Sequence, residues 1–553
     1  MTTWIHPLSA ELREPAEVIG GKAHGLVVLR RLGLPVPPGF VISTRACRAF
    51  LRDGRFPDGL GPQLAAAVSD LESATGRRLG GAERPLAVSV RSGAGTSMPG
   101  MMSTVLNLGL TAGATVALAG ETGDPRFALD SRLRFLAGFA SDVLGAGRTA
   151  LAAVDRVLAG PDAGTRALAG AIEDTERIIV ERGGGPVPED AGRQLELAVA
   201  AVFSSWHTPR ARTYRALHGI ADDLGTAVTV QAMVYGNLDG RSGTGVAFSR
   251  DPNTGEHVPF GEVVFGRQGE DVVSGRCSAG PLSGPGGLAE REPAVWGRLL
   301  AALDRLEEHY RDGCHVEFTF ERGELWILQV RPGGYTGRAA VRVAVDLVGA
   351  GVIGRDEAVL RVLPREVPHL RAPRIAVDGT VDVLTRGTGA SPGVAVGRVA
   401  TTADGAVRLA ARGPVVLLRP ETSPLDMHGL AAAAGVVTAR GGSTSHAAVV
   451  ARAMGKPAVV GAARLVVEDG VHVRVGPRTL PEGALVAVDG TGGEVVVGDP
   501  PLAPATADPR WERLLGWADE IAGGAAGGDD VPHLEDDVRR LEAARSVLLR
   551  RRS

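Results

Sequence analysis

The sequence predicts an α+β protein of several domains, for three reasons. Its 553 residues are enough for three or four domains with large cores. Short β-branched runs, which are typical of buried strands, alternate with stretches that have helical spacing. Gly is frequent, at 77 residues, and aromatic residues make up only 4% of the chain, which favours a loop-rich enzyme with mobile parts over an all-β scaffold.

Composition also limits the classes of partner and compartment. The net charge of −3 and the pI near 6.5 give no basic surface, so we expect no nucleic-acid partner. The three cysteines, Cys47, Cys277 and Cys314, have neither zinc-site spacing nor a disulfide framework, which indicates a reducing cytoplasm. Residues 1–13 lack the features of a signal peptide, and no apolar window approaches the roughly 18 residues of a membrane span, so we expect a soluble protein with no membrane partner.

The first expected elements place a lysine beside two glycines. A helix begins at Gly20–Lys22 and runs to about Arg31, and the Pro-rich segment 33–39 ends it before a strand at 40–42. From this position Lys22 could reach a nucleotide phosphate. Considered alone, such a residue is more often a solvated lysine at the start of a helix.

A strand at 86–91 brings Arg91 to the start of a Gly-rich loop that runs to residue 102. Such a loop can present backbone N–H groups to phosphates, although an ordinary surface loop remains an alternative. From residue 111 to about 220, Ala/Leu/Arg-rich stretches such as 125–144 and 191–206 predict a helical subdomain.

Strands return at 227–235, and the loop and strand at 242–250 could again cradle a phosphate. Two later strands, at 314–320 and 325–332, predict a hairpin. One face of this hairpin could present Glu317, Gln329 and Arg331, because each has the right parity in its own strand. An acid with an amide can hold Mg²⁺ through oxygen, and an arginine can clamp a phosphate. As a bare pattern this is weak, since exposed strand faces are routinely polar.

A helical connector at about 337–363 leads to a Pro-rich segment, 364–374, that can act as a hinge or a semi-rigid spacer. A second globular unit begins near Gly389. A Gly-rich break and a charged helix, 534–551, complete the sequence.

Within the second unit, residues 435–461 predict a strand, a tight turn, a short helix and another strand. The strand is the β-branched run 435–438, and Gly441 and Gly442 permit the turn. Ser443–Ser445 offers hydroxyls at the start of a helix that runs from His446 to Met454. Gly455 suits the left-handed residue after a helix, Pro457 prevents continuation, and 458–460 is the second strand.

A histidine at a helix N-terminus between two buried strands has a chemical meaning. Unpaired N–H groups and the helix dipole favour an anion there. A neutral imidazole is a nucleophile near pH 7 and can accept a phosphoryl group. The alternative is a structural histidine, which the cluster of small and hydroxyl residues around His446 makes less attractive.

The run Gly-Gly-x-Thr-Ser-His-Ala-Ala-Val-Val-Ala-Arg at 441–452, with Gly-x-Pro at 455–457, resembles the phosphohistidine signature of the PEP-utilising enzymes, most closely pyruvate, phosphate dikinase. Earlier segments resemble the ATP-grasp half of the same family in order and nearly without gaps. They are 88–94, 97–102, 106–110, 242–248 and 268–273.

The resemblance covers about residues 14–520 and implies a domain plan. An ATP-grasp domain would span 1–340, with the helical subdomain as an insertion at about 111–220. A linker, 341–380, would lead to a swivelling β/β/α phosphohistidine domain at 381–500, followed by a linker helix and tail at 501–553. The PEP/pyruvate-binding barrel of the dikinase is expected to be absent.

The resemblance also implies residue roles. His446 and Arg331 would be catalytic, and Mg²⁺ would be held by Glu317 and Gln329. Gly441, Gly442, Thr444 and Ser445 would form the phosphohistidine loop. ATP would contact Lys22, Arg91, Gln231, Met233, Val234, Thr244, Gly245, Glu262 and Arg331. Two positions differ from the family pattern: His315 replaces an acid, and Gly95 replaces a lysine or arginine.

By this resemblance, ATP and inorganic phosphate would phosphorylate His446 and yield AMP and pyrophosphate. The phosphoryl group would pass to pyruvate or another acceptor bound by a separate chain, and the protein could form a homodimer. Two alternatives remain open, namely direct transfer to a free small molecule and a degenerate nucleotide-binding regulatory protein.

Overall fold

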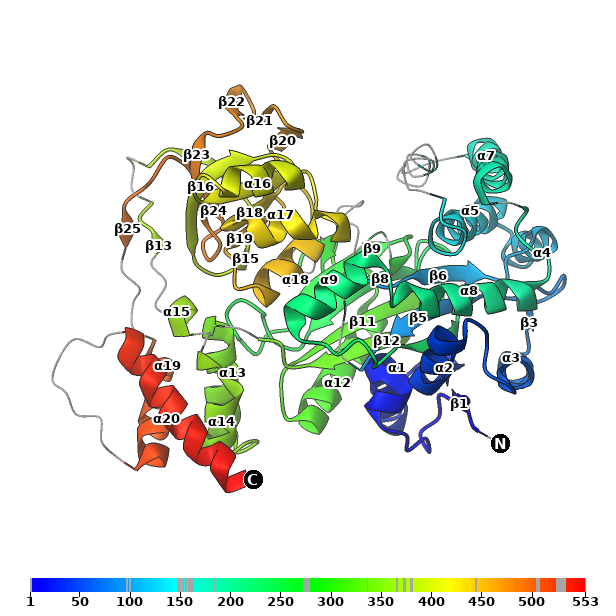
Figure 1. Cartoon of the computed structure of the whole chain (residues 1–553), viewed down its shortest axis with the longest axis horizontal. Helices are drawn as coiled ribbons and strands as arrows, with labels where there is room; N and C mark the ends of the chain where they lie inside the picture. The colour runs from blue at the N-terminus through cyan, green and yellow to red at the C-terminus, as the bar shows by residue number, and fades with distance from the viewer. Residues whose placement is uncertain are drawn as a thin grey trace. The chain divides into compact units, whose positions relative to one another are not determined.

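The computed structural model describes residues 2–95, 98, 101–146, 151, 154, 157, 164–183, 185–269, 271, 279–335, 337–364, 367–370, 374–377, 381–442, 445–503, 508–523 and 534–552. Two compact units are distinguished, and each is described by itself. The first comprises Met1–Ser242 with Phe318–Val330, and the second comprises Gly243–Glu317 with Arg331–Ser553 (Figure 1).

The first unit is built on a five-stranded antiparallel sheet of order β1-β2-β7-β5-β6. Its strands are β1 (Ile5–Pro7), β2 (Gly39–Ile42), β5 (Val88–Gly93), β6 (Thr104–Leu108) and β7 (Ala227–Ala232). The expected strand at 227–235 is too long, because β7 ends at Ala232 and the N–H of Tyr235 bonds the Glu321 carboxylate.

Helices account for most of the rest of this unit, as the sequence predicts. They are α1 (Ala16–Arg31), α2 (Thr44–Asp53), α3 (Leu60–Thr75), α4 (Ala112–Thr122), α5 (Pro125–Asp142), α7 (Thr165–Gly183), α8 (Ala191–Ser205) and α9 (Pro209–His218). A short parallel pair, β3 (Arg78–Leu79) and β4 (Pro85–Leu86), lies between α3 and β5 in the sequence.

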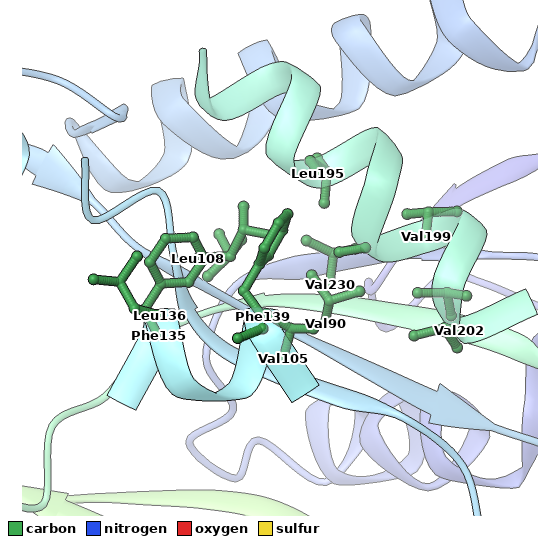
Figure 2. Packing of buried hydrophobic residues seen from close by; sticks show 14 of the residues in the cluster. Val90, Val105, Leu108, Phe135, Leu136, Phe139, Leu195, Val199, Val202 and Val230 are labelled. Atoms are coloured by element: carbon green, nitrogen blue, oxygen red, sulfur yellow. The ribbon is translucent and has the colours of Figure 1, made fainter. Parts of the chain in front are cut away.

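The core of the first unit lies between its sheet and the helices α5 and α8. Figure 2 shows Leu195, Val199 and Val202 of α8 close to the sheet residues Val90, Val105 and Val230, with Phe135, Leu136 and Phe139 of α5 beside them. All nine side chains are fully or almost fully buried. Because each such burial contributes about 1.5–3 kcal/mol, this cluster fixes the sheet that carries Arg91 and Gln231.

A second five-stranded sheet has the order β10-β9-β8-β11-β12. Its strands are β8 (Gly243–Phe248), β9 (Phe260–Phe265), β10 (Gly280–Pro281), β11 (Cys314–Glu321) and β12 (Glu324–Pro332), and the helices α11 (Leu288–Arg291) and α12 (Pro293–Tyr310) precede β11. The hairpin expected at 314–332 is confirmed, since β11 and β12 are neighbours in this sheet.

Residues 383–497 form an eight-stranded mixed sheet of order β14-β24-β23-β16-β17-β18-β19-β15. The strands are β14 (Val383–Arg386), β15 (Thr388–Ser391), β16 (Val394–Ala400), β17 (Val415–Arg419), β18 (Gly435–Thr438), β19 (Ala458–Val460), β23 (Leu485–Asp489) and β24 (Glu494–Val497). Strands β16 to β19 are parallel, and α16 (Ala403–Ala410), η3 (Pro424–Asp426), α17 (Met427–Ala432) and α18 (His446–Ala453) connect them. A three-stranded sheet of β20 (Leu465–Glu468), β21 (His472–Val475) and β22 (Arg478–Pro481) lies between β19 and β23 in the sequence.

Helices from two distant parts of the sequence share one further core in the second unit. They are α13 (Gly337–Gly349), α14 (Arg355–Arg361), α15 (Val367–Leu370), α19 (Pro509–Ala522) and α20 (Leu534–Arg552). The buried indole N–H of Trp511 on α19 donates to Asp537 Oδ2 on α20 at 3.0 Å. Two short strands, β13 (Arg374–Ile375) and β25 (Leu502–Ala503), pair with each other. No described helix of the chain is both long enough and apolar enough to span a bilayer.

Candidate active site

His446 occupies the position that the sequence predicts. Strand β18 ends at Thr438, Gly441 turns the chain with φ +94°, and α18 begins at His446. A Cβ at Gly441 would lie 2.8 Å from the Ser445 Cβ, so only glycine fits this turn. The expected left-handed residue at the end of α18 is confirmed as Gly455, with φ +63°. The turn therefore holds His446 at the first residue of a helix between two parallel strands.

The two ring nitrogens of His446 have different surroundings. Nδ1 lies 3.2 Å from the Oγ1 of Thr422, in the loop after β17. Nε2 is buried and has no hydrogen-bond partner among the described residues. If Nδ1–H donates to the hydroxyl oxygen, Nε2 keeps its lone pair and is the nucleophilic nitrogen. Thr422 is not among the site residues expected from the sequence.

Burial of His446, which is only 9% exposed, lowers the pKa of its imidazole, and the carboxylate of Asp426 raises it in part. Asp426 is fixed in place because its Oδ2 accepts the backbone N–H of Ser423 at 2.8 Å, and Arg419 lies 3.7 Å from its Oδ1. The imidazole is therefore neutral near pH 7, which is the form that can attack phosphorus.

The start of α18 also suits an anion. Ser445 is the residue that caps the helix, but its hydroxyl makes no capping bond, and its Oγ is buried without a partner in the described chain. The free N–H groups of the first helical turn and this hydroxyl could stabilise a phosphoryl group on His446. Gly442 accepts the Ser445 N–H at 3.0 Å. The predicted loop residue Thr444 lies outside the described residues.

In the first unit, the structure brings together Lys22 and the end of β5. The chain bends at Gly20, whose φ of +78° interrupts α1, and a Cβ there would lie 1.7 Å from Gly93 O. The Gly21 N–H donates to Ala94 O at 3.1 Å. A Cβ built on Gly93 would meet the Lys22 Cβ at 3.3 Å. These close backbone approaches place the lysine stem beside the loop that follows Arg91.

Arg91 and Gln231 are neighbours on adjacent strands. The Nη2 of Arg91 donates to Gln231 Oε1, and it also donates to the backbone oxygen of Leu328 at 3.2 Å. Gln231 is almost fully buried, and its amide nitrogen donates to Pro37 O. The guanidinium is thus held by an amide and a carbonyl.

Two other predicted nucleotide contacts, Met233 and Val234, and one predicted metal ligand, Gln329, lie in this unit. Met233 and Val234, both half-buried, directly follow β7. Gln329 is buried on β12, next to the Leu328 carbonyl that Arg91 contacts. Gly95, where the family has a cation, lies against the start of α1, because a Cβ on Gly21 would be 3.3 Å from Gly95 O.

In the second unit, Thr244 and Gly245 are buried on β8, and Glu262 lies opposite Val246 on β9. Arg331 Nη2 is 3.6 Å from Glu317 Oε1, so the predicted catalytic cation and the predicted metal ligand are adjacent.

His315 is two residues before Glu317 on the same strand. Its ring stacks on Phe248, with ring centres 4.5 Å apart. Burial, followed by the nearby charge of Arg331, lowers the pKa of His315 to about 4. The residue that replaces the family's acid is therefore a neutral imidazole.

Glu317 fits the binding of a divalent ion that also contacts nucleotide phosphates. The Glu317 side chain is 33% exposed and can offer a carboxylate oxygen. The described part of the chain contains no group of three or more His, Cys, Asp or Glu side chains that could enclose a metal. Mg²⁺ commonly binds to one or two protein oxygens and to substrate phosphates, which is the arrangement that Glu317 permits.

Two family descriptions match the chain. "Pyruvate phosphate dikinase, AMP/ATP-binding domain" matches residues 51–280, and "PEP-utilising enzyme, mobile domain" matches residues 411–493. The second match contains His446, Thr422 and Asp426.

Curated relatives are similar over most of this chain. Pyruvate, phosphate dikinase of Rhizobium meliloti (strain 1021) is 41% identical over 544 residues, which are 94% of this chain and 60% of the relative. Pyruvate, phosphate dikinase 2 of Zea mays is 41% identical over 91% of this chain and 58% of its own length. The chloroplastic enzyme of Flaveria trinervia is 41% identical over 92% of this chain and 54% of its own length. The chain thus spans between half and two thirds of the length of these relatives. In both matched regions, the chain is thus similar to pyruvate, phosphate dikinases and other PEP-utilising enzymes.

Proposed function

We propose that this protein uses ATP and inorganic phosphate to phosphorylate His446, with AMP and pyrophosphate as products. The phosphorus atoms balance, because the four in ATP and phosphate end as one in AMP, two in pyrophosphate and one on the histidine. The observation that supports this most strongly is the buried Nε2 of His446, which has no partner in the described chain and lies at the start of α18.

In this proposal Nε2 attacks the β-phosphorus of ATP and AMP leaves, while Nδ1–H donates a hydrogen bond to Thr422. Inorganic phosphate then attacks the γ-phosphorus of the histidine-bound diphosphate, so pyrophosphate leaves and the β-phosphoryl group stays on Nε2. The N–H groups at the start of α18 and the Ser445 hydroxyl then stabilise the new phosphoryl oxygens. The reaction needs no general base, since the low pKa leaves the imidazole neutral.

ATP would bind to an ATP-grasp domain. Lys22 and Arg91 would bind phosphate oxygens, and Gln231 to Val234 would line the adenine pocket. Arg331 would stabilise the phosphoryl group as charge develops on it. Mg²⁺ held by Glu317 and Gln329 would neutralise phosphate charge when bound.

We further propose that residues 381–500 swivel between this nucleotide site and a second site that holds pyruvate or another acceptor on a separate chain. The match to a mobile domain of PEP-utilising enzymes supports this. It also follows from the proposed chemistry, because His446 must be loaded at one site and unloaded at another.

Incubation with Mg²⁺ and ATP labelled at its β- and γ-phosphates tests the loading step. Acid-labile label is expected on wild-type protein and not on His446→Ala, and equal labelling of both proteins would exclude His446. AMP formation that depends on added phosphate would identify dikinase chemistry, whereas ADP would identify an ordinary kinase. Nucleotide binding with no label would indicate a regulatory protein.

A second experiment tests the acceptor. Labelled protein is mixed with pyruvate, with and without a separately produced PEP/pyruvate-binding domain of a dikinase. Labelled PEP is expected only when that domain is present, and slowly, because two separate chains lack the effective concentration of a covalent tether. PEP formed rapidly by this chain alone would show that it has its own pyruvate site.

A further inference from the structure

The two connections of the phosphohistidine domain are paired with each other. Strand β13 precedes the first strand of the domain, and β25 follows its last strand. They pair antiparallel, with Arg374 opposite Ala503 and Ile375 opposite Leu502. The N–H of Ala376 extends this pairing by donating to Pro501 O at 3.0 Å. We call residues 374–376 and 501–503 the linker ribbon.

A buried carboxylate fastens the linker ribbon to the domain. Asp489, at the end of β23, is 1% exposed, and its Oδ2 accepts the N–H of Ile375 at 3.0 Å. Its Oδ1 accepts the N–H groups of Thr491 and Gly492 at 2.9 and 2.8 Å. Arg374 Nε lies 3.8 Å from Oδ2. One carboxylate therefore joins the incoming linker to the β23–β24 turn through charge-assisted bonds.

Apolar packing also holds Ile375 of the linker ribbon against the domain. The side chain of Ile375 is 5% exposed and packs with Ala487 of β23 and Val496 of β24. These two strands belong to the sheet that carries the phosphohistidine segment. The ribbon is thus part of the core of this domain.

We propose that Asp489 is a positioning residue that makes the linker ribbon and the phosphohistidine domain turn as one body. This inference rests on the proposed swivelling. The two covalent connections of the domain then move together as one rigid element and do not separate during the catalytic cycle.

A reversible crosslink tests whether the linkers separate. Residues 374 and 503 are directly opposite in an antiparallel pair, where Cα atoms are about 4.5–5.5 Å apart, a separation that a disulfide can span. The double variant Arg374→Cys/Ala503→Cys should load His446 and release the label at rates within about twofold in its oxidised and reduced forms. The two single variants, oxidised in the same way, are the controls for the native cysteines.

A fall of tenfold or more in the oxidised form, restored by reductant, would overturn the inference, because the linkers would then have to separate. Absence of label in the reduced form as well would contradict the proposed function instead.

Proteolysis tests the ribbon independently of any activity. Asp489→Ala should increase trypsin cleavage after Arg374 by about tenfold under native conditions, while Asp382→Asn, which changes an exposed acid of the same domain, should not. Equal cleavage of Asp489→Ala and wild type would show that Asp489 does not hold the ribbon.

Discussion

The hydroxyl oxygen of Thr422 lies 3.2 Å from Nδ1 of His446, although the two residues are 24 positions apart. The contact joins the loop after β17 to the start of α18. It engages one ring nitrogen and leaves the other, Nε2, without a partner in the described chain. If this hydroxyl accepts a hydrogen bond from Nδ1–H, Nε2 is the nitrogen whose lone pair is available.

Replacing Thr422 tests this relationship. Thr422→Val should lower the rate of His446 phosphorylation by about tenfold, because one side-chain hydrogen bond that orients the ring is worth about 1.4 kcal/mol. Thr422→Ser keeps the hydroxyl and should stay within about threefold of wild type. Single-turnover labelling measures both rates, and equal loss in the two variants would point to a packing role for the threonine methyl group.

The rate of loading should depend on pH through His446. Burial lowers the pKa of its imidazole below the ordinary value of 6.5, and the neutral form is the nucleophile. The rate should therefore stay constant as pH falls from 8 to about 6.5 and decline only below that. Asp426→Asn removes the charge that raises this pKa and should move the decline to still lower pH. A decline already centred above pH 6.5 would contradict the assignment.

Arg331→Ala and Lys22→Ala should each slow phosphorylation by about 10²–10³-fold, since each removes a cation from a charge-assisted phosphate contact. The unfolding midpoint in urea should stay near that of wild type. Arg193→Ala, which removes an exposed arginine on α8, is the matched control and should not change the rate. Rates within threefold of wild type for the first two variants would place the nucleotide elsewhere.

Alanine substitutions at two glycines with positive φ distinguish the cost of backbone strain from the cost of a steric clash. Gly33→Ala should cost about 1–2 kcal/mol of unfolding free energy, because its φ is +67° and a Cβ there meets nothing within 4 Å. Gly20→Ala should cost more and should also weaken binding of a non-hydrolysable ATP analogue, because its Cβ would lie 1.7 Å from Gly93 O, beside Lys22. Urea unfolding and equilibrium binding measure the two effects. Equal costs for the two variants would mean that α1 can shift without consequence.

Local signals made the phosphohistidine segment predictable. The strand 435–438, the helix start at His446 and the strand 458–460 are confirmed at the expected residues. Each boundary is set by neighbouring residues in the sequence, through Gly441 in the turn and Gly455 after the helix. The α5 and α8 helices were predictable for the same reason.

Contacts between distant segments were not predictable from one sequence. The sequence predicted separate linkers and a tail for the connector helices, α19 and α20. In the structure they share one core around Trp511. The pairing of β13 with β25 joins residues more than a hundred positions apart, and neither two-residue strand has a sequence signal of its own. Thr422 escaped notice because hydroxyl residues are frequent and only the fold shows which of them faces a histidine.

The burial of His446 affects the lifetime of its phosphorylated form as well as its reactivity. A phosphoryl group bonded to imidazole is spontaneously lost when the ring is protonated and water attacks. Enclosure of the ring slows the second event, since few water molecules reach the bond. The enclosure of His446 would thus allow the phosphorylated protein to persist until it meets its acceptor, with little hydrolysis of the phosphohistidine.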